Sequence, residues 1–188
     1  VGAPYIDNVL NGEIPRIESV LDDLNLPSKP FCILLHHSDT YRIQDSGPQI
    51  RRIISQLKNQ DIHTVVIYPC SDPGYGAIVK EIENLFNNPQ FSIFKSIPFR
   101  QFLALLANAK FIIGNTSGGI LEAPYFDLPF ICVGERQKLR EMDDNVLQVK
   151  ANDKDIAHAI EQVMSGAFSP KTSGNQRFGS GIASKLIY

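Results

Sequence analysis

The chain has 188 residues, 43% of them hydrophobic and 20% charged, which is the composition of an ordinary globular domain with one core. Its 18 lysines and arginines nearly balance its 20 aspartates and glutamates, so the charge excludes a strongly basic surface for nucleic acid or membrane. The three cysteines form no CxxC pair, which favours a reducing cytoplasm, and no apolar run approaches the roughly 18 residues of a membrane span.

The first 29 residues are predicted to form a linker and a packing helix. Four prolines, at positions 4, 15, 27 and 30, surround one short amphipathic stretch, IESVLDDL. The chain also begins without a methionine, in a segment that reads as if entered midway through a linker. We therefore expect a fragment of a longer protein.

From residue 31 onward, short β-rich runs alternate with helical patterns, which is typical of βαβ units. The predicted strands are 31–35, 63–68, 91–95, 110–114, 129–133 and 145–149. The predicted helices are 48–60, 76–88, 99–109, 118–126 and 154–166. Several strands are apolar throughout, as in a sheet covered on both faces. The pattern predicts an α/β fold over 30–168, a doubly wound Rossmann-like parallel sheet of five or six strands, followed by a C-terminal loop and helix over 169–188.

The turn after the fourth predicted strand reads Asn115-Thr116-Ser117-Gly118-Gly119. Ligands of doubly wound sheets bind outside the carboxyl ends of the strands, so this turn is a candidate site. Helix N–H groups and the hydroxyls of Thr116 and Ser117 are suited to a phosphate, and simple helix capping is the alternative. The turn matches neither a Walker motif nor a dinucleotide fingerprint, which disfavours an NAD enzyme.

Glu122 is the one acid of the apolar segment that follows this turn. It is either a surface carboxylate or, beside a phosphate site, an acceptor of hydrogen bonds from ribose hydroxyls. The choice between these two interpretations depends on the assignment of the turn.

His36 and His37 end the first predicted strand, and alternation points them to opposite sides of the sheet. At most one of them faces a cleft, where it is able to bind a phosphate or transfer a proton, and a local structural role is the alternative. His63 and His158 are predicted to lie on the surface.

Two further turns carry polar groups. Asp72-Pro73-Gly74 has ordinary turn chemistry, which is enough to explain it structurally. Arg136 belongs to a cationic cluster after the fifth strand, which is either a solvated loop or the positive side of a diphosphate site. The sequence contains no zinc spacing, catalytic Cys/His pair or close carboxylate dyad, so we predict no metal site and no cofactor. Binding groups are abundant and general bases are scarce.

Several segments together resemble the C-terminal domain of the UDP-N-acetylglucosamine 2-epimerases, nearest the hydrolysing branch that makes N-acetylmannosamine for sialic acid biosynthesis. They are LLHHSDT, YPCSDPGYGAIVKEI, KSIPFRQFLALLANAKFIIGNTSGGILEAPYFDLPFICVGERQKLRE, NVLQV and GNQRFGSGIASKLI. The resemblance covers about residues 30–187, and Val1 to Asp7 resemble the interdomain linker. The other branch usually has an Arg-rich sequence in place of HHSDTYRIQ, and Thr116 stands where a serine is common.

The resemblance implies one half of a two-domain architecture of the glycosyltransferase-B type, with the nucleotide sugar in the cleft between two Rossmann-like halves. It places Thr116, Ser117 and Gly118 on the diphosphate, Glu122 on the ribose, Ile97 against uracil and Arg136 in the phosphate-side loop. His37 reaches the diphosphate or the reacting sugar, and Asp72 and Gly74 match a family turn without an assigned role.

In the family, elimination of UDP gives a 2-acetamidoglucal, and hydration then inverts C2. The acid–base carboxylates come largely from the N-terminal domain. The expected partners are therefore UDP-N-acetylglucosamine, the missing N-terminal Rossmann-like domain and further copies of the complete enzyme in a homo-oligomer. Three alternatives stay open: an epimerase for a GDP-linked diacetamido sugar, the donor domain of a glycosyltransferase, and a nucleotide-binding module without catalysis.

Overall fold

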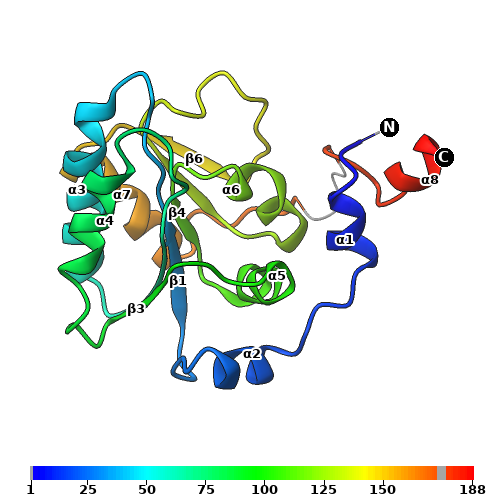
Figure 1. The fold of residues 1–188 in the computed structure, drawn as a ribbon, viewed down its shortest axis with the longest axis horizontal. Helices are drawn as coiled ribbons and strands as arrows, with labels where there is room; N and C mark the ends of the chain where they lie inside the picture. Colours follow the sequence, from blue (N-terminus) through cyan, green and yellow to red (C-terminus); the bar gives the residue numbers. More distant parts are fainter. Residues whose placement is uncertain (1, 173–176) are drawn as a thin grey trace.

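The computed structural model describes residues 2–172 and 177–188, so the start of the GNQRFGSG segment lies outside the described residues. The fold is a six-stranded parallel sheet with helices on both faces (Figure 1). Its strand order is β3-β2-β1-β4-β5-β6, so the chain winds outward from β1 in one direction and then from β4 in the other. The predicted α/β fold with a doubly wound parallel sheet is confirmed.

All six predicted strands are present. They are β1 (Phe31–Leu35), β2 (His63–Ile67), β3 (Phe91–Phe94), β4 (Ile112–Gly114), β5 (Phe130–Val133) and β6 (Val146–Val149). The central strand β1 pairs with both β2 and β4, and Leu35 stands opposite Ile67 on one side and Gly114 on the other. The strands β1, β4 and β5 are apolar throughout, as expected of strands covered on both faces, whereas β2 is equally buried but begins with His63 and Thr64.

Three helices cover one face of the sheet: α3 (Ser46–Lys58), α4 (Tyr75–Glu83) and α7 (Asp153–Met164), seen together in Figure 1. The apolar spacing in α3 predicts its buried side correctly, since Ile50, Ile53, Ile54 and Leu57 all belong to the core against the sheet. A short 3₁₀ turn, η1 (Ile43–Asp45), leads into α3.

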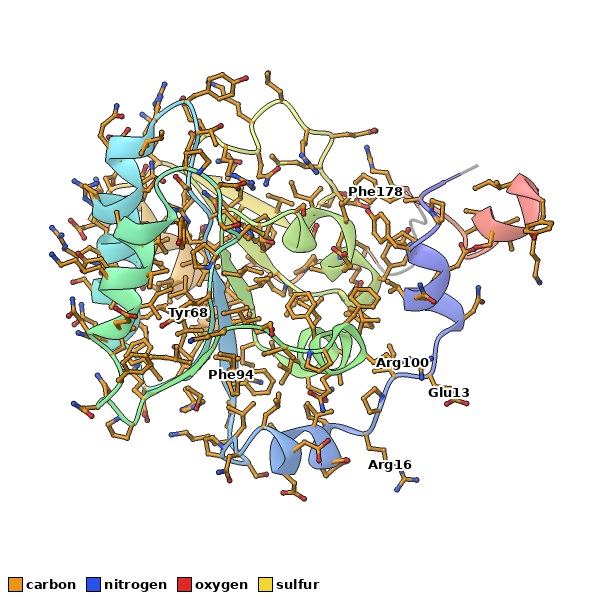
Figure 2. The ribbon with its side chains drawn as sticks, viewed as in Figure 1. Glu13, Arg16, Tyr68, Phe94, Arg100 and Phe178 are labelled. Carbon is orange, nitrogen blue, oxygen red and sulfur yellow. The ribbon has the colours of Figure 1, made fainter. Side chains whose placement is uncertain are left out.

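The opposite face is covered by α5 and by several shorter elements. They are α1 (Ile6–Asn11), α2 (Ile17–Asp23), α5 (Phe99–Asn108), α6 (Gly118–Leu121) and η2 (Ala123–Phe126). The last helix, α8 (Ala183–Ile187), lies against α1, where the Asp7 carboxylate accepts the backbone N–H groups of Ala183 at 3.1 Å and Ser184 at 2.7 Å. The backbone near Phe178, labelled in Figure 2, also bonds to the first residues, since its carbonyl accepts from Ala3 at 2.9 Å. No helix among the described residues is long and apolar enough to span a membrane.

Three details differ from the sequence-based expectations. The predicted helix 118–126 is divided into α6 and η2, because Pro124 has no N–H to continue an α-helical ladder. The helix α1 was not predicted. His63, predicted on the surface, is only 4% exposed: it opens β2 in register with Phe31, and its Nε2 lies 3.0 Å from Ser92 Oγ. His158 is exposed, as predicted.

Candidate functional site

The candidate site lies where the strand order reverses, between the carboxyl ends of β1 and β4. At this point Gly114 has φ +139°, and a Cβ on it would overlap the carbonyl oxygen of Leu35. A glycine is therefore required for the turn after β4 to lie directly against the end of β1. The turn after β4 and the two histidines after β1 are brought side by side by this contact.

Asn115, directly after β4, joins the two turns with its side chain. Its Oδ1 accepts the His37 N–H at 2.6 Å, and its Nδ2 donates to the His37 carbonyl at 2.9 Å. Its own carbonyl accepts from Gln137 Nε2 at 2.7 Å and from Arg136 Nη1 at 3.2 Å. Asn115 and Gln137 are both 1% exposed, and sequence reasoning assigned neither a role. The only signal for Asn115 was its place between an apolar strand and a glycine-rich turn.

The predicted phosphate turn, residues 115–119, makes more contacts within the chain than the sequence indicated. Thr116 is buried, and its Oγ1 accepts the Gly118 N–H at 3.2 Å, so the capping interpretation holds for this hydroxyl. Ser117 is half-buried and makes no side-chain capping bond to α6. A Cβ on Gly119 would overlap the Phe130 ring, so this glycine serves packing rather than close approach of an anion. Ser117 is the residue of this turn whose hydroxyl is best placed for a ligand.

Glu122 is not a surface carboxylate. Its Oε2 is buried without a hydrogen-bond partner among the described residues, and it lies 3.5 Å from the position that a Cβ on Gly118 would take. Burial raises the pKa of this carboxyl from 4.5 to about 6. The nearby Glu122 charge and, more strongly, burial raise the pKa of Tyr5 to about 12. Glu122 Oε2 is thus a buried acceptor that no donor in the described part of the chain satisfies.

His37 is held as a neutral donor. Its Nδ1 accepts the Cys70 N–H at 3.1 Å, so the neutral ring carries its proton on Nε2. Burial, helped by the positive charge of Arg136 and opposed by Asp72, lowers the pKa of His37 to about 4. His36 lies on the other face, where burial lowers its pKa to about 3. The predicted division between the two histidines is confirmed, since His37 is the one that lines a cavity.

The turn Asp72-Pro73-Gly74 is fixed against the same region. Gly74 has φ +93°, and a Cβ there would come within 2.5 Å of Ser38 Oγ, which itself donates to the Pro73 carbonyl at 2.6 Å. Asp72 Oδ2 lies 3.6 Å from Arg136 Nη2. The guanidinium of Arg136 is therefore held between Asp72 and the Asn115 carbonyl, and it is not a freely solvated loop residue.

Two cavities contain predicted site residues, and His37 lines one of them. One of about 400 Å³ is mostly apolar and is lined by residues that include Leu35, His37, Tyr68, Ile97, Phe99 and Phe102. Its floor lies where β2 and β3 end, since the Tyr68 N–H donates to the carbonyl of Phe94 at 2.9 Å (both labelled in Figure 2). The other, of about 540 Å³, has a mixed lining that includes the charged side chains of Asp72 and Arg136. A planar base suits the first cavity and charged groups suit the second.

Phe102 links the apolar cavity to the glycine turn. Its ring lines the cavity and also lies 3.5 Å from the position of a Cβ on Gly118. Ile97, His37, Gly118 and Arg136 are thus parts of one continuous region, with Glu122 beside it. A larger cavity of about 760 Å³ lies at the opposite, amino end of the sheet beside His63 and includes no predicted site residue.

Known proteins resemble this chain in sequence and in fold. A family model described as UDP-N-acetylglucosamine 2-epimerase matches residues 1–188. The UDP-N-acetylglucosamine 2-epimerase of Neisseria meningitidis is 32% identical over 165 residues, which cover 88% of this chain and 44% of that protein. The hydrolysing UDP-N,N'-diacetylbacillosamine 2-epimerase of Legionella pneumophila is 28% identical over 193 residues, covering 100% of this chain and 49% of that protein.

The fold is similar to one half of a solved structure, the Methanocaldococcus jannaschii UDP-GlcNAc 2-epimerase in complex with UDP-GlcNAc and UDP. The TM-score is 0.73 at 18% identity, over 100% of this chain and 52% of the other. The chain spans about half the length of the curated relatives it matches. Because the family model extends over the whole chain, the protein belongs to the UDP-N-acetylglucosamine 2-epimerase family.

Proposed function

We propose that the chain is the UDP-binding half of a hydrolysing UDP-N-acetylglucosamine 2-epimerase. The observation that carries the proposal is the buried Glu122 Oε2, which has no donor of its own within the described residues and lies beside the glycine turn. A buried acceptor without a partner is costly, and the vicinal hydroxyls of a ribose supply the missing donors. Family membership makes a nucleotide sugar the ligand to test.

In this proposal each group has a role set by its surroundings. The cavity beside Ile97 receives the uracil, and Glu122 accepts from the ribose. The Ser117 hydroxyl and the His37 Nε2–H donate to the diphosphate, where Arg136 offsets the negative charge. Because His37 is neutral, it acts as a hydrogen-bond donor whose charge does not change near pH 7.

The reaction proposed for the complete enzyme has two steps. A base removes the proton from C2 while the C1–O bond to UDP breaks, giving a 2-acetamidoglucal and UDP. Water then adds to this intermediate, with hydroxyl at C1 and hydrogen at C2 on the opposite face, and N-acetylmannosamine is released. In this proposal the groups of the described site stabilise the departing UDP, and none of them is assigned the role of the base. We therefore expect the acid–base carboxylates in the remainder of the protein, and no turnover by this chain alone.

Calorimetric titration of the chain with UDP and with GDP tests the proposal. Replacing Glu122 with glutamine removes a charge-assisted acceptor, which is worth about 2 kcal/mol, or roughly 30-fold in Kd. Ser117→Ala should weaken UDP binding less, and Glu161→Gln on the exposed face of α7 is the matched control. UDP binding that Glu122→Gln leaves unchanged would contradict the ribose assignment, and preference for GDP would favour an epimerase for GDP-linked sugars.

The complete enzyme separates the remaining alternatives. Release of free N-acetylmannosamine from UDP-N-acetylglucosamine supports the epimerase, whereas transfer of the sugar to an acceptor identifies a glycosyltransferase. Nucleotide binding without either reaction identifies a non-catalytic module. Homo-oligomerisation of the complete enzyme stays a prediction, to be measured by light scattering.

A further inference from the structure

We propose that Asn115 is a positioning residue that fixes His37 and Arg136 relative to the Thr116-Ser117 turn before a ligand arrives. The contacts that define this role lie within the chain, and only its consequence for UDP binding rests on the proposed function. Asn115 touches no ligand in this proposal, so it acts through the residues it holds.

The Asn115 side chain extends the pairing of β1 and β4 beyond the last regular pair. Strand pairing ends at Leu35 and Gly114, and the Asn115 N–H still donates to the Leu35 carbonyl at 3.3 Å. Beyond this point β1 and β4 are no longer paired, and the backbone of His37 has no partner in β4. The side-chain amide of Asn115 bonds to both backbone groups of His37, accepting from its N–H at 2.6 Å and donating to its carbonyl at 2.9 Å. His37 is thereby held in place although the sheet has ended.

The chemistry requires an amide at position 115. His37 presents one N–H and one carbonyl, and a primary amide offers an acceptor and a donor side by side on one small planar group that matches this pair. An ionised aspartate would face the His37 carbonyl with a second acceptor and would bury a charge. Alanine would leave two buried backbone groups unpaired, at a cost comparable to other buried unsatisfied groups.

The Asn115 carbonyl fixes the other side of the site. It accepts from Gln137 at 2.7 Å and from Arg136 at 3.2 Å, which uses both of its lone pairs. Asp72 holds the same Arg136 guanidinium from the other side. A shift of the Asn115 peptide therefore moves the Arg136 guanidinium and the His37 imidazole together.

The test begins with the ligand-free chain. In the wild type, ¹⁵N NMR of the imidazole should show His37 neutral, with its proton on Nε2, down to a pH near 4. In Asn115→Ala the His37 backbone loses its anchor, the Cys70 bond to Nδ1 loosens, and the pKa of His37 should move toward 6.5 with a mixture of tautomers. Asn115→Ser keeps one polar group and is the milder variant if alanine prevents folding.

Gln90 provides a matched control at the opposite end of the sheet. Its Nε2 donates to three backbone carbonyls, those of Leu57, Gln60 and Ile62. Gln90→Ala should lower the urea midpoint, as the Asn115 variants do, and should leave the His37 signals and the UDP affinity unchanged.

The outcomes separate this proposal from the proposed function. A weakening of UDP binding by about tenfold or more in the folded Asn115 variants, with altered His37 signals, supports the positioning role. Unchanged His37 tautomer and pKa in either folded variant overturn it, whatever the UDP result. If the wild-type chain binds no UDP while the His37 signals respond to Asn115, the proposed function fails and the positioning role stands.

Discussion

Replacing Glu122 with glutamine should change how the stability of the chain depends on pH. Burial raises the pKa of this carboxyl from 4.5 to about 6, and each pKa unit corresponds to about 1.4 kcal/mol. Ionising Glu122 therefore costs the folded state about 2 kcal/mol relative to the unfolded chain. Below pH 4.5 the group is protonated in both states, so the cost is absent. It develops as the pH rises from 4.5 through 6 and is complete above that range.

The assay is urea unfolding of the wild type and of Glu122→Gln between pH 4 and pH 8, with the difference in unfolding free energy plotted against pH. This difference should increase by about 2 kcal/mol in favour of Glu122→Gln as the pH rises, because glutamine never ionises. Effects of the buried histidines are common to both proteins and cancel. The corresponding difference for Glu161→Gln should stay flat. A flat curve for Glu122→Gln as well would refute the claim that burial of this carboxylate raises its pKa.

Two further predictions concern stability. Gly119→Ala should destabilise the chain by about 1–3 kcal/mol in urea unfolding, because the added methyl group overlaps the Phe130 ring. The control, Gly76→Ala, places its methyl group in open space on α4 and should stabilise the chain by up to about 1 kcal/mol. Equal effects at the two positions would contradict the packing described for Gly119. The free energy of unfolding should also fall as the pH drops below about 6.5, because the unfolded chain protonates histidines whose pKa values are lowered in the fold. His37→Gln should reduce the slope of unfolding free energy against pH. An unchanged slope would show that His37 is accessible and charged.

The sheet could be predicted from the sequence because its signals are local. Runs such as Phe31 to Leu35 are apolar throughout, and the spacing in α3 repeats over a helix of 13 residues. The helix α1 lacks such a signal, since it has six residues and only Ile6 and Val9 are buried. A helix this short depends on packing against distant parts of the chain. His63 was misplaced for a related reason, because its burial depends on the neighbouring strands and Ser92.

The site could be predicted only as a set of turns. The sequence pointed to His37, Ser117, Glu122 and Arg136 through their positions after strands and through a family resemblance. It placed Asn115 in the candidate turn but gave no indication of its bonds to His37, which join residues 78 positions apart. Nor did it indicate that Glu122 is buried, since one acid in an apolar helix is compatible with either environment. Long-range hydrogen bonds and burial of single polar atoms have no local pattern.

The way in which α8 is attached bears on which part of the molecule unfolds first. Its first amides are held by the ionised side chain of Asp7, while Leu186 and Ile187 remain exposed, so this helix gains little from apolar contact. The Ser184 hydrogen bonds keep the pKa of Asp7 below its usual value, and strong acid that protonates it removes the attachment. We therefore expect the C-terminal helix to detach and return as a separate cooperative unit while the hydrogen exchange of the central strands stays slow.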